Sequence, residues 1–268
     1  MKTALIQLDV KSDKKKNIEH AETLLERAAS KGAELIVLPE MFNCPYGIQY
    51  FKEYSESIPD GPTCRMLSSV AKKRKIIVVG GSMPEAQGGK LYNASPVFSS
   101  AGKLIAKHRK IHLFDINLKT VKMQESAVLT AGKEPTVFDT PIGKCGLIIC
   151  YDVRFPELFR LMLKKGVKMV VMPGAFTVPT GEAHWHMLMK TRAVDNQVYM
   201  VAVSPARSRG EGYKAFGHSL VSDPFGQIVV EGGISQTTLF ADIKSERIAE
   251  IRAMLPLLRH SRLKMPQS

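Results

Sequence analysis

Short apolar segments alternate with amphipathic ones along the whole chain, and this alternation is the feature that most limits the possible folds. Helices and strands that alternate in this way form layers in which helices cover sheets. Helices are predicted at about 13–30, 62–75, 155–165, 182–196 and 246–254. Strands are predicted at 2–8, 33–38, 76–80, 92–98, 103–108, 137–139, 145–149, 167–172, 198–203, 220–222, 228–231 and 239–243.

The strands at 92–98 and 103–108 form a predicted hairpin around Gly102, which indicates a mixed α/β sheet rather than a purely parallel one. Periodicity leaves open whether the chain forms one sheet or two. At 268 residues and 44% hydrophobic composition, the chain is long enough to bury a full core. No internal repeat of roughly 20–50 residues and no linker is visible, so we expect a single domain over residues 1–268.

Cys150 stands directly after the apolar run 146–149 and directly before Tyr-Asp-Val-Arg-Phe-Pro-Glu. A turn from strand to helix leaves its side chain at the sheet edge, where backbone N–H groups stabilise a thiolate and any oxyanion that it creates. The alternative is a small core cysteine, because free cysteine is among the most buried residue types. The flanking sequence favours a nucleophile.

Two more residues of chemical interest follow strands. Glu40 ends the apolar segment 33–39, and Lys110 follows the segment 103–109. Taken singly, they read as a solvated carboxylate and a surface lysine. Ligands bind at strand ends in α/β folds, however, so the three residue types are better read together. A carboxylate base, a thiol nucleophile and a cation that stabilises an oxyanion are a complete set for acyl transfer.

These segments resemble the three catalytic blocks of the nitrilase superfamily, carbon–nitrogen hydrolases with a Glu-Lys-Cys triad. The blocks are 38–40, 108–115 and 146–157, and their order and spacing agree with the family. The resemblance runs from Ala4 to Ile251 and is closest to the omega-amidase branch. The segments that suggest this branch are 41–47, 123–126, 173–176, 183–185, 192–197 and 204–207. The resemblance implies a four-layer αββα sandwich with mixed sheets that usually forms a homodimer.

The resemblance also implies roles for individual residues. Cys150 would attack an amide carbon, while Lys110 and the backbone N–H of Tyr151 would hold the oxyanion. Glu40 would accept a proton and later activate the water that hydrolyses the thioester. The ammonium of Lys110 is expected to favour the thiolate, and two nearby carboxylates would keep it charged. Glu125 is the expected second carboxylate and would position the substrate; an ordinary loop glutamate is the alternative.

Substrate contacts are predicted at two further side chains. Arg154, four residues after the thiol, would bind the remote carboxylate of a dicarboxylate monoamide, or would instead pair with Glu157. Tyr46 resembles a tyrosine that contacts substrate in the family, although a tyrosine packed on the sheet is the alternative. The expected reaction converts 2-oxoglutaramate or 2-oxosuccinamate to ammonia and the 2-oxo acid. Another family amidase, such as one acting on deaminated glutathione, is the nearest competitor.

Histidine residues suggest two other kinds of site. Cys150, His184 and Asn196 occur in the order of a papain-like hydrolase, but the local signature of such a cysteine is absent and the spacing is too short. His184 and His186 lie two apart on a predicted helix, do not share a face, and lack an accompanying carboxylate. Packing is therefore the favoured role for both, and we expect neither a metal nor another cofactor.

The net charge of +13 raises the possibility of a non-catalytic basic binding protein. The densest basic segments are 72–75 and the tail with Arg259, Arg262 and Lys264, which we interpret as a solvated helix face and a frayed terminus. Neither contains the interleaved aromatic residues of a single-strand binder, so no nucleic-acid partner is expected. A cationic field instead favours small anionic substrates.

The sequence also carries expectations about the cellular compartment. The apolar start of the chain is broken by Asp9 before it reaches the length of a signal peptide, and no segment approaches the ~20 apolar residues of a membrane span. The four cysteines lack Cys-x-x-Cys spacing, which argues against a disulfide framework and a thiolate zinc site. We therefore expect a cytoplasmic protein without a membrane partner.

Overall fold

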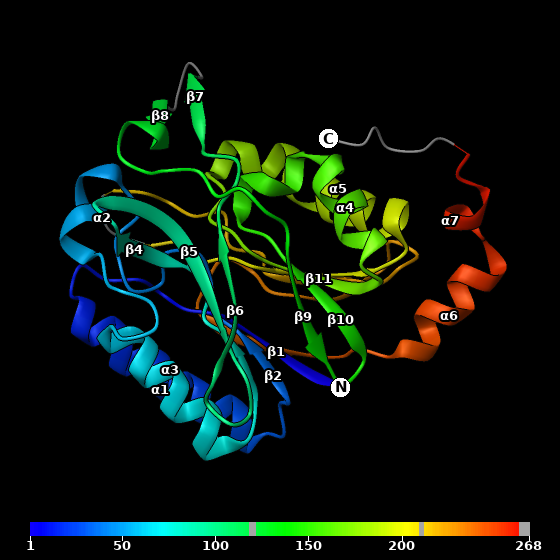
Figure 1. Cartoon of the computed structure of the whole chain (residues 1–268), viewed down its shortest axis with the longest axis horizontal. Coiled ribbons are helices and arrows are strands. Elements are labelled where there is room, and N and C mark those ends of the chain that lie inside the picture. Colours follow the sequence, from blue (N-terminus) through cyan, green and yellow to red (C-terminus); the bar gives the residue numbers. More distant parts are fainter. Residues whose placement is uncertain (118–121, 209–211, 263–268) are drawn as a thin grey trace.

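Two mixed sheets stacked face to face form the centre of the computed structural model, which describes residues 1–117, 122–208 and 212–262 (Figure 1). The first sheet has the order β15-β1-β2-β3-β5-β4, with β6 also paired to β5. Its strands β1, β2 and β3 are parallel, and its remaining pairs are antiparallel. The strands are β1 (Lys2–Gln7), β2 (Leu35–Val37), β3 (Ile77–Val79), β4 (Met83–Gln87), β5 (Lys90–Phe98), β6 (Leu104–Arg109) and β15 (Thr237–Asp242).

The second sheet has the order β14-β13-β12-β11-β10-β9. Strands β10, β11 and β12 are parallel at its centre, and antiparallel strands flank them. A separate two-stranded sheet pairs β7 (Asp115–Asn117) with β8 (Lys122–Gln124). The strands of the second sheet are β9 (Thr136–Thr140), β10 (Gly143–Leu147), β11 (Val167–Pro173), β12 (Tyr199–Val203), β13 (Leu220–Ser222) and β14 (Ile228–Glu231).

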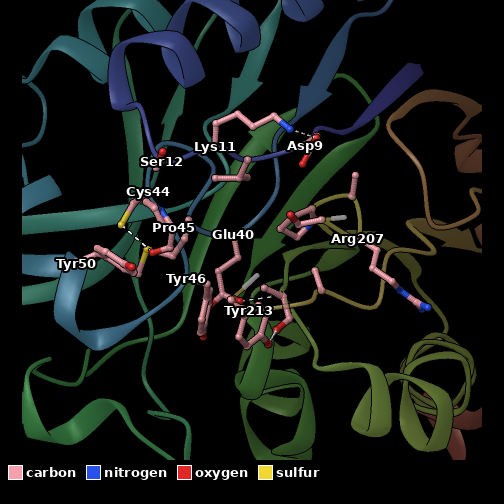
Figure 2. A pocket seen from close by; sticks show the side chains of 18 of the residues that line it. Asp9, Lys11, Ser12, Glu40, Cys44, Pro45, Tyr46, Tyr50, Arg207 and Tyr213 are labelled. Atoms are coloured by element: carbon pink, nitrogen blue, oxygen red, sulfur yellow. Dashed lines mark hydrogen bonds and ion pairs between the residues drawn. The ribbon is translucent and has the colours of Figure 1, made fainter. Parts of the chain in front are cut away.

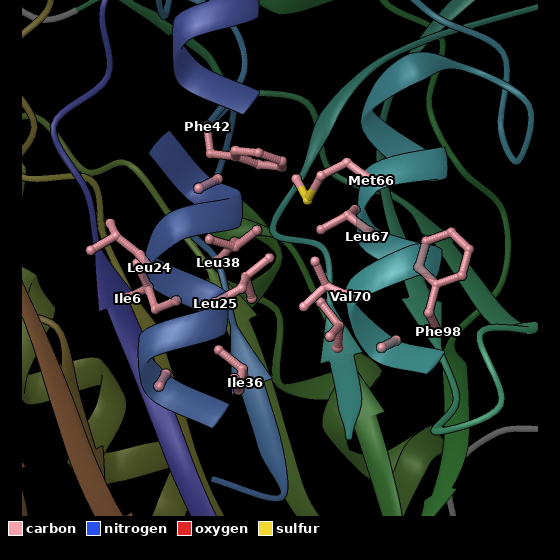
Figure 3. Packing of buried hydrophobic residues seen from close by; sticks show 14 of the residues in the cluster. Ile6, Leu24, Leu25, Ile36, Leu38, Phe42, Met66, Leu67, Val70 and Phe98 are labelled. Carbon is pink, nitrogen blue, oxygen red and sulfur yellow. The ribbon is translucent and has the colours of Figure 1, made fainter. Parts of the chain in front are cut away.

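Helices α1 (Lys14–Ser30) and α3 (Pro62–Arg74) cover the outer face of the first sheet (Figure 1). Figure 3 shows how side chains from both helices meet those of the sheet in one apolar cluster. Side chains alternate across a strand, so Ile6 faces the helices while Leu5 faces the second sheet. Both faces of β1 are therefore buried, which explains its nearly continuous apolar sequence.

Helices α4 (Pro156–Lys164) and α5 (Val178–Asn196) cover the outer face of the second sheet. A separate apolar cluster joins the inner faces of the two sheets, with Leu5 and Val37 on one side and Leu147 and Val171 on the other. Three apolar clusters thus lie between four layers. The arrangement confirms the predicted α/β fold, a four-layer αββα sandwich with mixed sheets.

Several boundaries differ from the sequence prediction. Helix α5 begins at Val178 rather than at 182, because Thr177 caps its N-terminus and Pro179 occupies the first turn, where proline is favoured. Helix α2 (Ile48–Tyr54) lies in a segment for which no helix was predicted. Strand β4 was not predicted either; its sequence contains Pro84 and Glu85, which break the usual strand pattern.

The C-terminal part of the described chain consists of α6 (Ser245–Met254) and α7 (Leu257–His260), which lie at one side of the sandwich (Figure 1). Helix α6 packs on it: Ile248 is buried in the cluster between the sheets, and Arg252 donates to the carbonyl of Val167 at 3.3 Å. The predicted basic residue Lys264 lies outside the described residues. Among the helices of residues 1–117, 122–208 and 212–262, none is long and apolar enough to cross a membrane.

Candidate active site

Cys150 begins a short 3-10 helix, Cys150–Arg154, just beyond the end of β10. Its φ of 47° lies in the left-handed region, which a non-glycine residue adopts only where the surroundings enforce it. The turn is held by the carboxylate of Asp152, which accepts a hydrogen bond from the Ile149 N–H at 3.0 Å. Cys150 is only 4% exposed, so the turn delivers its thiol into a nearly closed site.

Glu40 follows β2, and its carboxylate is fully buried. Oε1 accepts a hydrogen bond from the Asn93 amide at 2.8 Å, and Oε2 accepts one from the backbone N–H of Ala175 at 2.7 Å. Lys110 Nζ lies 3.1 Å from Oε1. These partners come from three separate segments and hold the carboxylate in one orientation.

Lys110 lies between two buried carboxylates. Its Nζ is 3.1 Å from Glu40 Oε1 and 2.9 Å from Glu125 Oε2, and its side chain has no solvent exposure. Glu125 in turn accepts hydrogen bonds from the Tyr46 hydroxyl at 2.7 Å and from the Phe114 N–H at 2.8 Å. An ammonium carries three N–H groups, so two ion pairs leave one donor for another ligand.

The pKa values of Glu40 and Lys110 are both raised, but for different reasons. Burial raises the pKa of Glu40, which Lys110 lowers and Glu125 raises further. Burial alone lowers the pKa of Lys110, but Glu125, Glu40 and Cys150 reverse this effect and raise it. The ammonium therefore stays protonated in its buried position.

The Cys150 thiol has a raised pKa, mainly because of burial and then because of the nearby Glu40 carboxylate, although Lys110 lowers it. Lys110 thus favours the thiolate, as expected from the sequence, but burial and Glu40 outweigh its effect. One ammonium already balances one of two carboxylates, so a thiolate would add a second uncompensated negative charge. The resting site holds a neutral thiol beside Glu40, and a proton passing between them leaves the buried net charge unchanged.

A pocket of ≈ 800 Å³ opens beside Glu40 (Figure 2). Glu40, Tyr46 and Tyr213 come together at its inner end, and the cationic side chains Lys11 and Arg207 lie toward its rim. Its size suits a small organic ligand, since such pockets usually measure about 300–1,000 Å³. Glu40 and Tyr46 line the pocket, so it joins the Glu40 carboxylate to the molecular surface.

Tyr213 was not predicted from the sequence. Its ring stacks on that of Tyr46 with centroids 4.5 Å apart, and its hydroxyl donates to the carbonyl of Ala175. Burial raises the pKa of Tyr213, and the nearby acidic groups Cys150, Glu40 and Glu125 raise it further, which places this tyrosine in the same electrostatic environment. No local motif marks this tyrosine, because it reaches the site from a loop far along the chain.

A second unpredicted set of residues supports the cysteine turn. The buried Asp152 carboxylate accepts from the His112 N–H at 2.9 Å, and its two oxygens lie 3.0 Å from His108 Nε2 and 2.8 Å from His112 Nδ1. Burial would raise the pKa of Asp152, but these histidines lower it well below its usual range. Asp152 thereby ties the Cys150 turn to the segment that carries Lys110. Both histidines lie in the block 108–115 that also contains Lys110, and this position was the sequence signal that could have identified them.

The predicted substrate contacts Tyr151 and Arg154 lie on the same 3-10 turn as the thiol. The backbone N–H of Tyr151 belongs to the residue after Cys150, while its ring packs edge-on against Phe114 at 5.2 Å. The Arg154 guanidinium lies 3.4 Å from His184 Nδ1 and 5.1 Å from the ring centroid of Phe176. Within the described part of the chain, no ion pair joins it to Glu157. The alternative pairing is therefore not formed, and binding of a substrate carboxylate by Arg154 stays a prediction.

The histidines weighed in the sequence analysis fall into two environments. His184 contacts Arg154, and the Asn196 amide donates to the carbonyl of Arg192 in its own helix at 2.9 Å. This arrangement gives no papain-like Cys-His-Asn relay. For His186 the prediction of an unaccompanied packing residue is wrong, because its Nε2 lies 2.7 Å from Glu231 Oε1. The strand that supplies this carboxylate is distant in sequence.

Comparison with known proteins places these features in a family. The carbon-nitrogen hydrolase family model matches residues 2–253. The omega-amidase NIT2 of Mus musculus is 48% identical over 97% of this chain and 94% of its own length. The crystal structure of Saccharomyces cerevisiae Nit3, a member of branch 10 of the nitrilase superfamily, superposes with a TM-score of 0.90, 42% identity and coverage of 98% of this chain and 97% of that one.

A more distant structure carries information about a cysteine. A mutant of the amidase from Nesterenkonia sp. AN1 shows the result of Michael addition of acrylamide at its active-site cysteine. That structure superposes with a TM-score of 0.78 at 25% identity and covers 96% of this chain and 98% of that one. From the matched family model, the full-length relatives and the shared sandwich, we conclude that this chain belongs to the carbon-nitrogen hydrolase family.

Proposed function

We propose that this protein is an omega-amidase that hydrolyses the terminal amide of small 2-oxo dicarboxylate monoamides. The proposed substrates are 2-oxoglutaramate and 2-oxosuccinamate, and the products are ammonia and the 2-oxo acid. The observation that carries the proposal is the buried cluster of Cys150, Glu40 and Lys110 in a chain 48% identical to the mouse omega-amidase over 97% of its length. The cluster supplies the chemistry, and the relatives suggest the substrate class.

In the first half of the reaction, the Cys150 thiol transfers its proton to Glu40 as Sγ forms a bond to the amide carbon. The free N–H of Lys110 and the backbone N–H of Tyr151 stabilise the resulting oxyanion. When the tetrahedral intermediate collapses, the C–N bond breaks and Glu40 returns the proton to the leaving nitrogen. Ammonia departs, and an acyl thioester remains on Cys150.

In the second half, a water molecule replaces ammonia beside Glu40. The carboxylate takes a proton from the water as its oxygen attacks the thioester carbon, and the same donors stabilise the second oxyanion. The C–S bond then breaks, and Glu40 returns the proton to the sulfur. The raised pKa of Glu40 suits this repeated exchange, because an acid with a pKa nearer neutrality both accepts and releases protons readily.

A panel of amides tests the proposed substrate class. The purified protein is incubated with 2-oxoglutaramate, 2-oxosuccinamate, a neutral amide of similar length and deaminated glutathione, and ammonia release is measured. We expect the highest kcat/KM for the 2-oxo dicarboxylate monoamides. A higher value for deaminated glutathione would assign the protein to the competing amidase activity. No ammonia from any amide, with folded protein, would contradict enzymatic function.

Two further properties belong to the proposal. Leu161 on α4 and Met187 on α5 are 39% and 56% exposed on the outer helical layer, which supports a homodimer formed through this layer. Light scattering coupled to size-exclusion chromatography should give twice the monomer mass.

A cytoplasmic location is also proposed. All four cysteines are free, which supports this location, and cell fractionation tests it. No nucleic-acid or membrane partner is proposed.

A further inference from the structure

We propose that His186, His218 and Glu231 form a binding site for a divalent transition-metal ion such as Zn²⁺. The three side chains come from α5, from the segment before β13 and from β14. One potential ligand atom of each lies within 4.8 Å of the others. None of the three belongs to the Glu40, Lys110 and Cys150 cluster, so the site is separate from the proposed amidase chemistry.

The donor atoms already converge on one point. His186 Nε2 lies 2.7 Å from Glu231 Oε1, and His218 Nδ1 lies 2.9 Å from the same oxygen. Ligand atoms around a tetrahedral zinc ion stand roughly 3.3 Å apart, given metal–ligand distances of about 2.0–2.2 Å. A small outward movement of the two rings therefore makes room for an ion. The side chains are between 26% and 39% exposed, which gives them space for this movement and leaves access for water.

The backbone holds His218 in position for this role. Its φ of 57° is left-handed, an uncommon conformation for a residue with a side chain. The His218 N–H donates to the Gly233 carbonyl at 2.9 Å, and the indole N–H of Trp185 donates to the His218 carbonyl at 2.7 Å. The ring stacks on Phe216 with centroids 4.5 Å apart. These contacts direct the imidazole toward Glu231, whose carboxylate lies within hydrogen-bond distance of Nδ1.

The donor set determines which ions fit. Two imidazole nitrogens and one carboxylate oxygen are the ligand types of open zinc sites, in which water fills a fourth position. Imidazole also suits Cu²⁺, Ni²⁺ and Co²⁺, whereas Mg²⁺ and Ca²⁺ prefer oxygen ligands. On binding, each imidazole donates a lone pair from the nitrogen that now faces Glu231. The proton on that nitrogen moves to the other ring nitrogen or to solvent, and no electron transfer is involved.

The test uses the full chain carrying Cys150→Ala, because the active-site thiol is a competing zinc ligand. After treatment with a chelator and its removal, ZnCl₂ is titrated by calorimetry, and CoCl₂ is followed by its visible absorption. We expect one ion per chain, a rise in melting temperature with zinc, and little response to MgCl₂. Glu231→Gln and His186→Ala, each in the same background, should weaken zinc binding about tenfold or more.

His20→Ala is the matched control, since His20 is also near the surface and lies 2.8 Å from a polar side chain, Gln236 Oε1. It should bind zinc as tightly as the parent. The melting temperature without metal shows whether each variant is folded. If His186→Ala does not fold, the test rests on Glu231→Gln. Equal binding by parent, Glu231→Gln and His20→Ala would mean adventitious binding elsewhere and would overturn the site. Absence of a one-to-one complex in the folded parent would do the same.

Discussion

Lys110 Nζ lies 3.1 Å from Glu40 Oε1, and neither side chain has solvent exposure. A buried ion pair of this kind is costly unless further hydrogen bonds satisfy both groups. Here Asn93 and the Ala175 N–H complete the Glu40 carboxylate, and Glu125 provides the second partner of the ammonium. The cation and the base are thus held rigidly beside the thiol, which is the arrangement expected of preorganised catalysis.

Cys150→Ala should abolish turnover and leave the fold intact. The substitution removes only one sulfur atom and leaves the backbone of the turn unchanged, so the melting temperature should stay within about 4 °C of the parent value. Mass spectrometry after incubation with substrate should show an acyl adduct on the parent protein and none on the variant. Burial raises the pKa of both Cys44 and Cys64 to about 12, so neither should substitute as nucleophile. An adduct on Cys44, Cys64 or Cys145 would contradict the mechanism.

Lys110→Arg should lower kcat by a factor of roughly 10²–10³, the usual effect of removing an oxyanion donor. The charge is kept, but a wide planar guanidinium replaces a compact ammonium between two carboxylates. Lys110→Gln should also destabilise the fold, by about 3–5 kcal/mol, because it leaves two buried carboxylates without a cation. Denaturant unfolding and steady-state kinetics separate the two effects. A near-normal kcat in either variant would exclude the oxyanion role.

Glu125→Gln should shift the acidic limb of the kcat/KM profile toward lower pH. Glu40 must be ionised to act as a base, so activity rises as the pH passes through its pKa. Burial raises that pKa, Lys110 lowers it and the negative charge of Glu125 raises it, so neutralising Glu125 should lower it. To obtain kcat/KM at each pH, the rate is measured over substrate concentrations that range from below KM to saturation. An acidic limb that stays in place or moves upward would mean that Glu125 does not act on Glu40 through its charge.

Acid should destabilise the protein partly through Asp152. Burial would raise its pKa, but hydrogen bonds with His108 and His112 lower it well below the usual value. A lowered pKa in the folded state contributes stability above the unfolded pKa of about 3.9, and this contribution is lost as pH falls toward the folded value. Asp152→Asn should therefore lose melting temperature at pH 7 and show a shallower further loss below about pH 4. Parallel pH dependences for parent and variant would contradict this linkage.

How much of this site could be predicted depends on whether a residue belongs to a local pattern. Glu40, Lys110 and Cys150 each follow a strand, β2, β6 and β10, and the architecture brings these strand ends to one region of the molecule. Tyr213 and Glu231 have no such signal, because their partners Tyr46 and His186 come from segments far apart in sequence. Contacts of this kind depend on the packing of loops, which periodicity does not encode.

The net effect of the buried charges on the pKa of Cys150 could also not be predicted from local sequence patterns. The sequence predicts that Lys110 favours a thiolate, but the thiol pKa also depends on how deeply Cys150 is buried and on how many carboxylates share one ammonium. Tyr46 shows the same limitation: its hydroxyl donates to Glu125, its ring stacks on Tyr213 and it lines the pocket, while its contact with substrate stays a prediction. The thiol pKa and the contacts of Tyr46 can therefore be judged only in the folded structure.

Two arginines compete as the anchor for the remote carboxylate of the substrate. Arg154 stands on the turn that carries the thiol but does not belong to the pocket lining, whereas Arg207 lines the pocket. Arg207 donates to the Phe216 carbonyl at 3.0 Å, and its buried Nε lacks a hydrogen-bond partner within the described part of the chain. A desolvated charge pair with a substrate carboxylate is worth about 2–5 kcal/mol.

Arg154→Met and Arg207→Met, compared side by side, identify the anchor. In line with the sequence-based prediction, Arg154→Met should depress kcat/KM for 2-oxoglutaramate about 30-fold or more, and much less for a neutral amide of similar length, because only the first substrate has a remote carboxylate. A damaged fold lowers both rates alike, so the ratio of the two is the informative quantity. A selective loss in Arg207→Met alone would transfer the role to Arg207. Equal losses on both substrates in both variants would leave neither arginine as the anchor and would confine Arg154 to its contact with His184.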